Sequence, residues 1–240
     1  MKRYEEIDVL KGVAVICMII FHFFYFPNQY GFKEIEYNTI TLKIIAKVAQ
    51  IIFITCVGIN LVFAKKKTND ASYHLKRIGK IACYAILMSL FTYYVFQERY
   101  VKFGILHFVA FSSLLLFTFV DNVETMKVIT TILALLFVLN KIKPELFRII
   151  PSPLAFISGF YNDRYSAVDH FPILPWGFLI CLGVFIGHYL LNNEINTPNY
   201  ITNNPVSEVL KNIGKRSLEI YAVHWAILYV IYCIIYSKLR

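Results

Sequence analysis

Three histidines lie in apolar stretches of the sequence, where an ionisable side chain is costly. They are His22, His107 and His224. Lipid offers no hydrogen-bond partner, so each must find one within the protein. A neutral imidazole can take up or release a proton near physiological pH, which suits general acid–base catalysis or a proton relay. The alternative for each histidine is a packing role, with a hydrogen bond to a neighbouring helix.

The first of these histidines shares a helical stripe with charged residues. Asp8, Lys11, Val15, Met18 and His22 follow one another at intervals of three or four, which places them on one face of a helix. That face carries a charged pair at one end and an imidazole farther along. The charged pair could instead be an ion pair at the helix end with no further role.

The other two histidines occupy later apolar stretches. His107 follows Gly104 closely, and His224 shares a helical stripe with Ser217 and Tyr221. We expect all three histidines at middle to outer depth of the membrane, where they could face one cavity. Metal binding is the rival use, but no H-x-x-x-H, H-E-x-x-H or Cys/His spacing supports it. The five cysteines include no CxxC pair, so we predict no metal and no disulfide framework.

Residues 161–176 stand out as polar and aromatic, just before a long apolar run. Carboxylates and aromatic faces suit a sugar or another hydroxyl-rich substrate, although Trp and Tyr are also common as interfacial anchors. The predicted substrate-binding residues are Asp163, Asp169, His170, Trp176 and, in the last apolar stretch, Tyr221.

The composition indicates where these residues are placed. Of the 240 residues, 58% are hydrophobic and only 16% are charged, whereas soluble domains have about 45–50% and 25%. This argues against a soluble globular protein, a disordered chain or a nucleic-acid binder. The net charge is +9. The basic residues lie between apolar segments, where positive charge more often sets membrane topology than binds nucleic acid.

Seven apolar runs are long enough, or nearly so, to cross a bilayer, which takes about 20 residues. These runs are 12–32, 48–64, 81–97, 103–120, 128–140, 170–193 and 220–237. A further run is broken by Pro151 and Pro153, and we predict an interfacial or re-entrant segment near 146–160. The predicted fold class is all-α: a polytopic integral membrane helical bundle of about seven transmembrane helices, forming a single domain over 1–240.

The loops favour a cytoplasmic N-terminus. Residues 65–80 hold six Lys and Arg, and basic residues concentrate on the inner side of a membrane. We expect this stretch to be a loop, with His74 solvated in it. Gly183 and Gly187 permit close helix packing, either within the chain or in a homodimer, and His188 follows them.

Four blocks of sequence, in order along the chain, carry a family resemblance. The first runs from Arg3 through Ile7-Asp-Val-Leu-Lys-Gly to His22, and the second is Gly104-Ile-Leu-His-Phe-Val-Ala. The third runs from Asp169-His-Phe-Pro-Ile-Leu-Pro-Trp176 to Gly187, and the fourth is Gly214-Lys-Arg-Ser-Leu-Glu-Ile-Tyr-Ala-Val-His-Trp225. Together they resemble the prokaryotic proteins similar to the catalytic domain of heparan-alpha-glucosaminide N-acetyltransferase, a group of transmembrane acyltransferases.

This resemblance implies acetyl transfer across the membrane, in the plasma membrane of a prokaryote. Acetyl-CoA would be the donor on the cytoplasmic side, and a hydroxyl or amine of a glycan or small acceptor would be modified on the other. It also implies that His22 is the catalytic histidine. The family usually has Arg where this chain has Lys11, so the charge is kept without the bidentate fork.

We therefore expect a CoA-dependent acyltransferase that contacts membrane lipid, a CoA thioester and an acceptor. His22 would act as general base or carry the acetyl group, while His107 and His224 position or polarise. The predicted residues for binding the donor are Asp8, Lys11, Lys76, Arg77, Lys215 and Arg216.

Two other classes of protein remain open. A small multi-helix transporter or proton-coupled permease would use the same histidines as a proton relay. A membrane protein with only a structural or assembly role would respond to no ligand.

Overall fold

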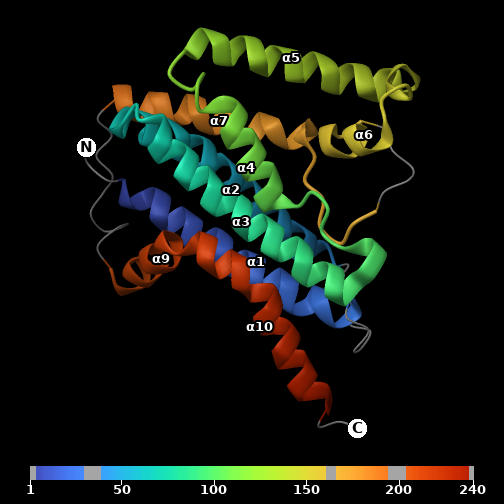
Figure 1. Ribbon diagram of the computed structural model, residues 1–240. Coiled ribbons are helices and arrows are strands. Elements are labelled where there is room, and N and C mark those ends of the chain that lie inside the picture. Colours follow the sequence, from blue (N-terminus) through green and yellow to red (C-terminus); the bar gives the residue numbers. More distant parts are fainter. Residues whose placement is uncertain (1–3, 30–38, 161–165, 194–203, 238–240) are drawn as a thin grey trace. The chain divides into compact units, whose positions relative to one another are not determined.

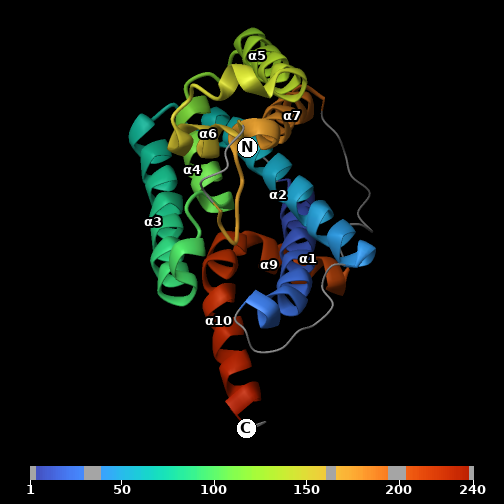
Figure 2. The same ribbon diagram turned by 90° about the vertical axis from the view of Figure 1, so that its right-hand side faces the viewer.

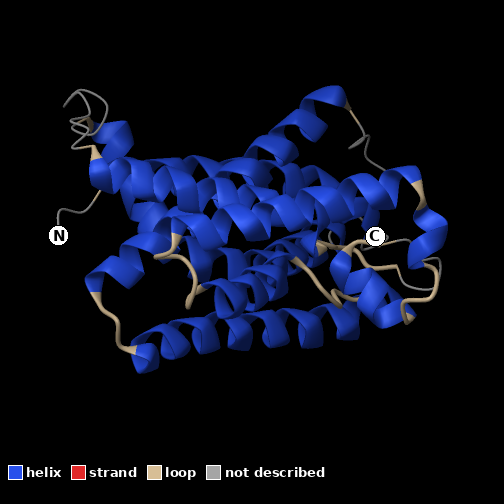
Figure 3. Ribbon diagram, turned by 90° about the horizontal axis from the view of Figure 1, so that it is seen from above, coloured by secondary structure: helices blue, strands red, loops and turns tan. Residues whose placement is uncertain are grey.

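The computed structural model describes residues 4–29, 39–160, 166–193 and 204–237. Within these ranges the chain is helical, with loops and one isolated bridge between Phe103 and His170. Figure 3 shows the helices joined by loops, with no strand in the described part of the chain. The predicted all-α class is confirmed.

Six helices are long and apolar enough to cross a membrane. They are α1 (Glu5–Gln29), α2 (Ile40–Lys67), α3 (Ala71–Phe96), α5 (Val123–Ile142), α7 (Ile173–Asn192) and α10 (Ser217–Ser237). At 1.5 Å per residue, a helix of about 20 residues matches the roughly 30 Å hydrocarbon core. Because each of these helices covers most or all of one of the predicted apolar runs, the integral membrane bundle is confirmed.

The remaining predicted crossing, 103–120, forms a shorter helix. The helix α4 (Ile105–Leu116) has 12 residues, or about 18 Å, and turns follow it from Phe117 to Asp121. Residues 144–158 form two short pieces, η2 (Pro144–Phe147) and α6 (Ser152–Ser158). Gly159, with a φ of 89°, ends α6 in the left-handed conformation that glycine favours. The other short elements are η1 (Gln97–Arg99) and α9 (Pro205–Lys215).

The chain divides into two compact units, and the boundary falls inside α2. The terminal unit comprises residues 1–56 and 195–240, and the central unit comprises residues 57–194. In the terminal unit, α9 packs across α1, and α10 also contacts α1 (Figures 1 and 2).

Two glycines allow the close crossing of α1 and α9. A Cβ built on Gly12 would overlap the backbone of Leu210, and one built on Gly214 would overlap the backbone of Asp8. The two helix backbones are therefore in direct contact. This contact fixes where the chain enters α10, because only Arg216 separates the end of α9 from the start of α10.

The central unit has a similar close contact between α2 and α7. A Cβ on Gly58 would overlap the backbone of Ile180 and lie against Gly183, while Gly187 packs against Ile59 and Val62. The predicted close packing at Gly183 and Gly187 thus occurs within one chain. In the same unit, α3 packs on α4 and α5 packs on α7.

We predict that Gly214→Ala lowers the free energy of unfolding by about 1–3 kcal/mol, because the added methyl group forces α9 away from α1. Gly79 is the matched control, since a Cβ there meets no atom within 4 Å. Gly79→Ala should be neutral or slightly stabilising, because alanine favours a helix over glycine. Thermal unfolding of both variants in detergent measures the difference. Equal melting temperatures would contradict the close crossing.

Candidate active site

Two of the three predicted catalytic histidines are in contact. In the terminal unit, Nδ1 of His22 on α1 lies 3.0 Å from Nε2 of His224 on α10. The ring centroids are 4.8 Å apart. His224 is buried and His22 is half-buried. The two residues are 202 positions apart in sequence, so packing of the first helix against the last creates this pair.

The hydrogen-bond partners determine where the protons lie. Nδ1 of His224 is 2.6 Å from the carbonyl oxygen of Tyr221, one turn earlier on α10. A carbonyl oxygen only accepts, so Nδ1 of His224 carries a proton. A charged imidazole in this apolar setting is costly, so His224 is neutral and its Nε2 offers a lone pair. The hydrogen bond between the rings is therefore donated by Nδ1 of His22.

This direction leaves the other nitrogen of His22 as a base. With its proton on Nδ1, a neutral His22 has its lone pair on Nε2. Among the residues that the structure describes, no hydrogen bond engages Nε2 of His22. The histidine pair thus presents the lone pair on Nε2 of His22, and the hydrogen bond to His224 keeps the proton of His22 on Nδ1.

Aromatic rings surround the pair. Phe26 stacks on His22 at 4.8 Å between centroids, and Trp225 lies 5.6 Å from the same ring. Tyr221 meets His224 edge-on at 5.1 Å and stacks on Phe53 of α2 at 6.1 Å. Tyr221, predicted to bind substrate, therefore lies beside the histidine pair and orients it through its carbonyl group. The rings restrict both imidazoles and limit water around them.

A network of charged residues lies where α1 meets α9. Nζ of Lys11 lies 2.7 Å from a carboxylate oxygen of the buried Asp8. The two residues thus form the ion pair at the helix end that was the alternative to a donor-binding role. Lys211, which sequence reasoning did not single out, is buried and pairs with Glu5 at 2.7 Å and with Glu208. The hydrogen bonds that Lys211 donates to Glu208 and Glu5 raise its pKa, and they outweigh the opposing effect of desolvation.

The other predicted donor-binding residues are exposed basic side chains. Lys215 and Arg216 stand at the end of α9 in the terminal unit, and Lys76 and Arg77 stand on α3 in the central unit. The guanidinium of Arg77 lies 5.8 Å from the ring centre of Tyr73, and Nζ of Lys67 lies 5.7 Å from it.

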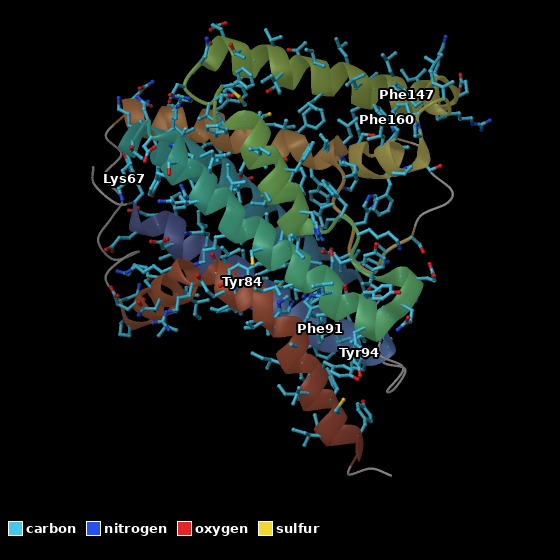
Figure 4. The ribbon with its side chains drawn as sticks, in the orientation of Figure 1. Lys67, Tyr84, Phe91, Tyr94, Phe147 and Phe160 are labelled. Atoms are coloured by element: carbon cyan, nitrogen blue, oxygen red, sulfur yellow. The ribbon has the colours of Figure 1, made fainter. Side chains whose placement is uncertain are left out.

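The prediction of a basic loop over 65–80 is wrong. The helix α2 continues to Lys67 and α3 begins at Ala71, so only residues 68–70 connect them. The basic side chains therefore project from two helix ends, and Figure 4 shows Lys67 at the end of α2 and Tyr84 farther along α3. Asp70 caps α3 by accepting a hydrogen bond from the backbone of Ser72.

The expectation of a solvated His74 is also wrong. It is buried in the first turn of α3, where its Nε2 donates to the carbonyl of Thr68 at 2.8 Å. Its ring also stacks against Phe117. The short connection turns the histidine inward. His188 has a comparable structural contact, a hydrogen bond of 2.5 Å from its Nε2 to the carbonyl of Val120.

His107 belongs to the central unit and has its own partner. Its Nε2 is 3.1 Å from Oγ of Ser89 on α3. Its Nδ1 is buried, and no hydrogen-bond partner for it occurs among the described residues. Sequence reasoning missed Ser89, because a single serine in an apolar helix more often bonds its own backbone.

Three of the predicted substrate-binding residues contact the protein itself. Asp169 accepts a hydrogen bond from the backbone N–H of Ile105 at the start of α4. His170 stacks on Phe156 and donates from Nε2 to its carbonyl at 2.7 Å. Trp176 packs on Phe171 at 4.9 Å. Burial lowers the pKa of His170, against the opposing effect of the bond to Phe156. Asp163 lies outside the described residues.

Aromatic stacking also holds the segment around α6. The rings of Phe147 and Phe160 stack with their centroids 4.2 Å apart and their planes at 10°. Both residues are labelled in Figure 4. Asn140 donates to the carbonyl of Gly159, which ties the end of α5 to the end of α6. Over the residues described, no group of three or more His, Cys, Asp or Glu side chains could hold a metal ion.

These features define a polytopic membrane protein in which two histidines from α1 and α10 are hydrogen-bonded to each other. The family model described as heparan-alpha-glucosaminide N-acetyltransferase, catalytic, matches residues 3–226, and the chain belongs to this family. Membership indicates a membrane acetyltransferase-like function and an acyltransferase-type enzyme, which confirms the resemblance seen in the sequence. Comparisons with curated proteins and with solved structures gave no match.

We predict that Lys211→Met destabilises the protein, because it leaves the carboxylates of Glu5 and Glu208 without their shared cation. The control is Lys127→Met, which breaks an ion pair of the same i, i+3 type with Glu124. The Lys127 side chain is 59% exposed and that of Lys211 is 4% exposed, and exposed pairs contribute only about 0–1 kcal/mol. Melting temperatures should fall clearly for the first variant and little for the second. The reverse order would show that the α1–α9 ion pairs are not structural.

Proposed function

We propose that this chain transfers an acetyl group from acetyl-CoA to a hydroxyl or amine of a glycan or similar acceptor. We further propose that residues 1–240 form one membrane domain for this reaction. The family match supports the reaction type. The observation that carries the proposal is the hydrogen bond between Nδ1 of His22 and His224, which leaves a lone pair on Nε2 of His22 that no described residue engages.

In the proposed reaction, His22 acts as general base. Its Nε2 takes the proton from the acceptor hydroxyl or amine as that group attacks the thioester carbonyl. The carbon–sulfur bond then breaks, and the CoA thiolate leaves with the proton that His22 returns. Atoms and charge balance without another reactant.

His224 has a supporting role in this step. While His22 holds the extra proton, its Nδ1–H points at the lone pair of His224, which stabilises the positive charge. The carbonyl of Tyr221 keeps His224 in the tautomer that allows this. The same Nε2 could instead attack the thioester and carry the acetyl group as an acyl-imidazole. Both routes need the same lone pair.

We propose that exposed basic residues of each unit can bind CoA phosphates on the cytoplasmic side of the membrane, with the N-terminus on that side. Lys76, Arg77, Lys215 and Arg216 are exposed and can pair with phosphate at little cost. Lys11 is already paired with Asp8 at 2.7 Å, so its binding to phosphate would have to compete with that carboxylate. We place the protein in the plasma membrane of a prokaryote.

A proton-coupled permease is the competing proposal, and one observation argues against it. A relay must pass the proton beyond His224, but Nδ1 of His224 is bonded to the backbone carbonyl of Tyr221. A carbonyl oxygen accepts a hydrogen bond without passing a proton on. The hydrogen-bond chain from His22 through His224 therefore stops at the carbonyl oxygen of Tyr221. This is expected for a positioned base and not for a proton relay.

We predict that His22→Ala lowers acetyl transfer by at least about 100-fold, the usual contribution of a general base. His224→Gln should lower it less, since the base remains but its tautomer is no longer fixed. His188→Gln is the control and should retain activity, because its amide can still donate to Val120.

The measurement is acetyl-CoA consumption by purified protein in liposomes, with glucosamine as acceptor, together with the melting temperature of each variant. Full activity of folded His22→Ala would refute the mechanism, and proton movement without acetyl-CoA consumption would favour the permease.

A second prediction concerns the donor. The double variant Lys76→Gln/Arg77→Gln should raise the KM for acetyl-CoA about tenfold, since hydrogen bonds to charged groups contribute about 1.5 kcal/mol or more. Acetyl-pantetheine lacks the CoA phosphates, so its KM should be the same in both proteins and insensitive to salt. An unchanged KM for acetyl-CoA would exclude these two residues from phosphate binding.

A further inference from the structure

Ser89 fixes the proton on His107 in the central unit. The hydroxyl of Ser89 lies 2.6 Å from the carbonyl oxygen of Val101 and 3.1 Å from Nε2 of His107. A hydroxyl has one hydrogen, and only the carbonyl contact requires it. Toward His107, Oγ therefore accepts, and Nε2 of His107 carries the proton.

The surrounding backbone holds this arrangement in place. In the segment between α3 and α4, the backbone N–H and the carbonyl of Val101 both form hydrogen bonds to side chains of α3. Its N–H donates to Oγ1 of Thr92 at 3.0 Å, and its carbonyl accepts from Ser89. Thr92 is fully buried. The position of Oγ of Ser89, and with it the tautomer of His107, is set by several bonds.

The remaining nitrogen of His107 receives no hydrogen bond from the described residues. In the neutral ring with its proton on Nε2, Nδ1 has a lone pair. It is buried, and no hydrogen bond to it occurs in the described part of the chain. Buried acceptors in native proteins are nearly always satisfied, so an O–H or N–H from outside the described residues is the expected partner. The site lies next to the start of α4, where the Asp169 carboxylate accepts from Ile105.

We propose that Ser89 is a positioning residue that holds His107 in the Nε2–H tautomer, so that Nδ1 accepts a hydrogen bond from an O–H or N–H group of an acceptor molecule bound in the central unit. The identity of the ligand rests on the proposed acetyl transfer, whereas the tautomer does not. The acceptor is thereby bound through a hydrogen that it donates. Acceptors without an O–H or N–H at that position are excluded.

The first test is ¹⁵N NMR of the full chain in lipid bilayers, with labelled histidine and with His107→Gln to assign the signal. Nδ1 of His107 should be unprotonated and Nε2 protonated. Ser89→Ala should produce a mixture of tautomers, and Ser89→Thr should restore one. Ser158→Ala is the control, because that hydroxyl bonds to the carbonyl of Leu154 in its own helix. A protonated Nδ1 in the native chain, or an unchanged tautomer in Ser89→Ala, would overturn the positioning role.

The second test uses glucosamine as the probe. Added without acetyl-CoA, it should shift the Nδ1 signal of His107, and acetyl-CoA alone should not. At saturating acetyl-CoA, Ser89→Ala should raise the KM for glucosamine about tenfold and leave the KM for the donor unchanged. His107→Asn, whose amide oxygen lies near the position of Nδ1, should retain more affinity than His107→Gln. A signal that glucosamine does not move would overturn the contact with the acceptor.

The two tests separate this proposal from the reaction. If the native chain consumes no acetyl-CoA, the acetyl transfer fails, while the tautomer and the glucosamine shift can still be measured. If acetyl transfer occurs normally with an unresponsive His107, the reaction stands and the proposal fails.

Discussion

The carbonyl oxygen of Tyr221 sets the direction of every hydrogen bond in the histidine pair. Because it can only accept, His224 must donate to it from Nδ1 and must in turn accept from His22. This order of donors leaves Nε2 of His22 as the basic nitrogen. A charged side chain is not needed to orient the base, which suits an apolar setting where an additional buried charge would be costly.

The terminal unit is built to keep α1 and α10 in register for this pair. Gly12 and Gly214 bring the backbones of α1 and α9 into contact, and the ion pairs of Lys211 hold α9 to Glu5 at the helix end. At the other end, the hydroxyl of Tyr232 on α10 donates to the carbonyl of Phe23 on α1. The histidines lie between these attachments. Packing, charge and hydrogen bonding therefore act on the same two helices.

The sequence predicts the helices well and their contacts poorly. Long apolar runs mark α1, α2, α3, α5, α7 and α10, because the bilayer demands length and low charge. The shorter α4 could not be recognised, since its apolar run continues into turns after Leu116. The sequence predicts a solvated His74, because nothing in a basic stretch indicates that α2 extends to Lys67. The pairing of His22 with His224, and of Ser89 with His107, depends on tertiary packing that helical periodicity cannot specify.

The proposed chemistry requires that His22 donates from Nδ1 to His224 and keeps its lone pair on Nε2. The most direct measurement is ¹⁵N NMR of histidine-labelled protein in lipid bilayers, read for coupling across the hydrogen bond between the two rings. We expect a coupling between Nδ1 of His22 and Nε2 of His224, with Nε2 of His22 unprotonated. Absence of the coupling, together with a proton on Nε2 of His22, would contradict it.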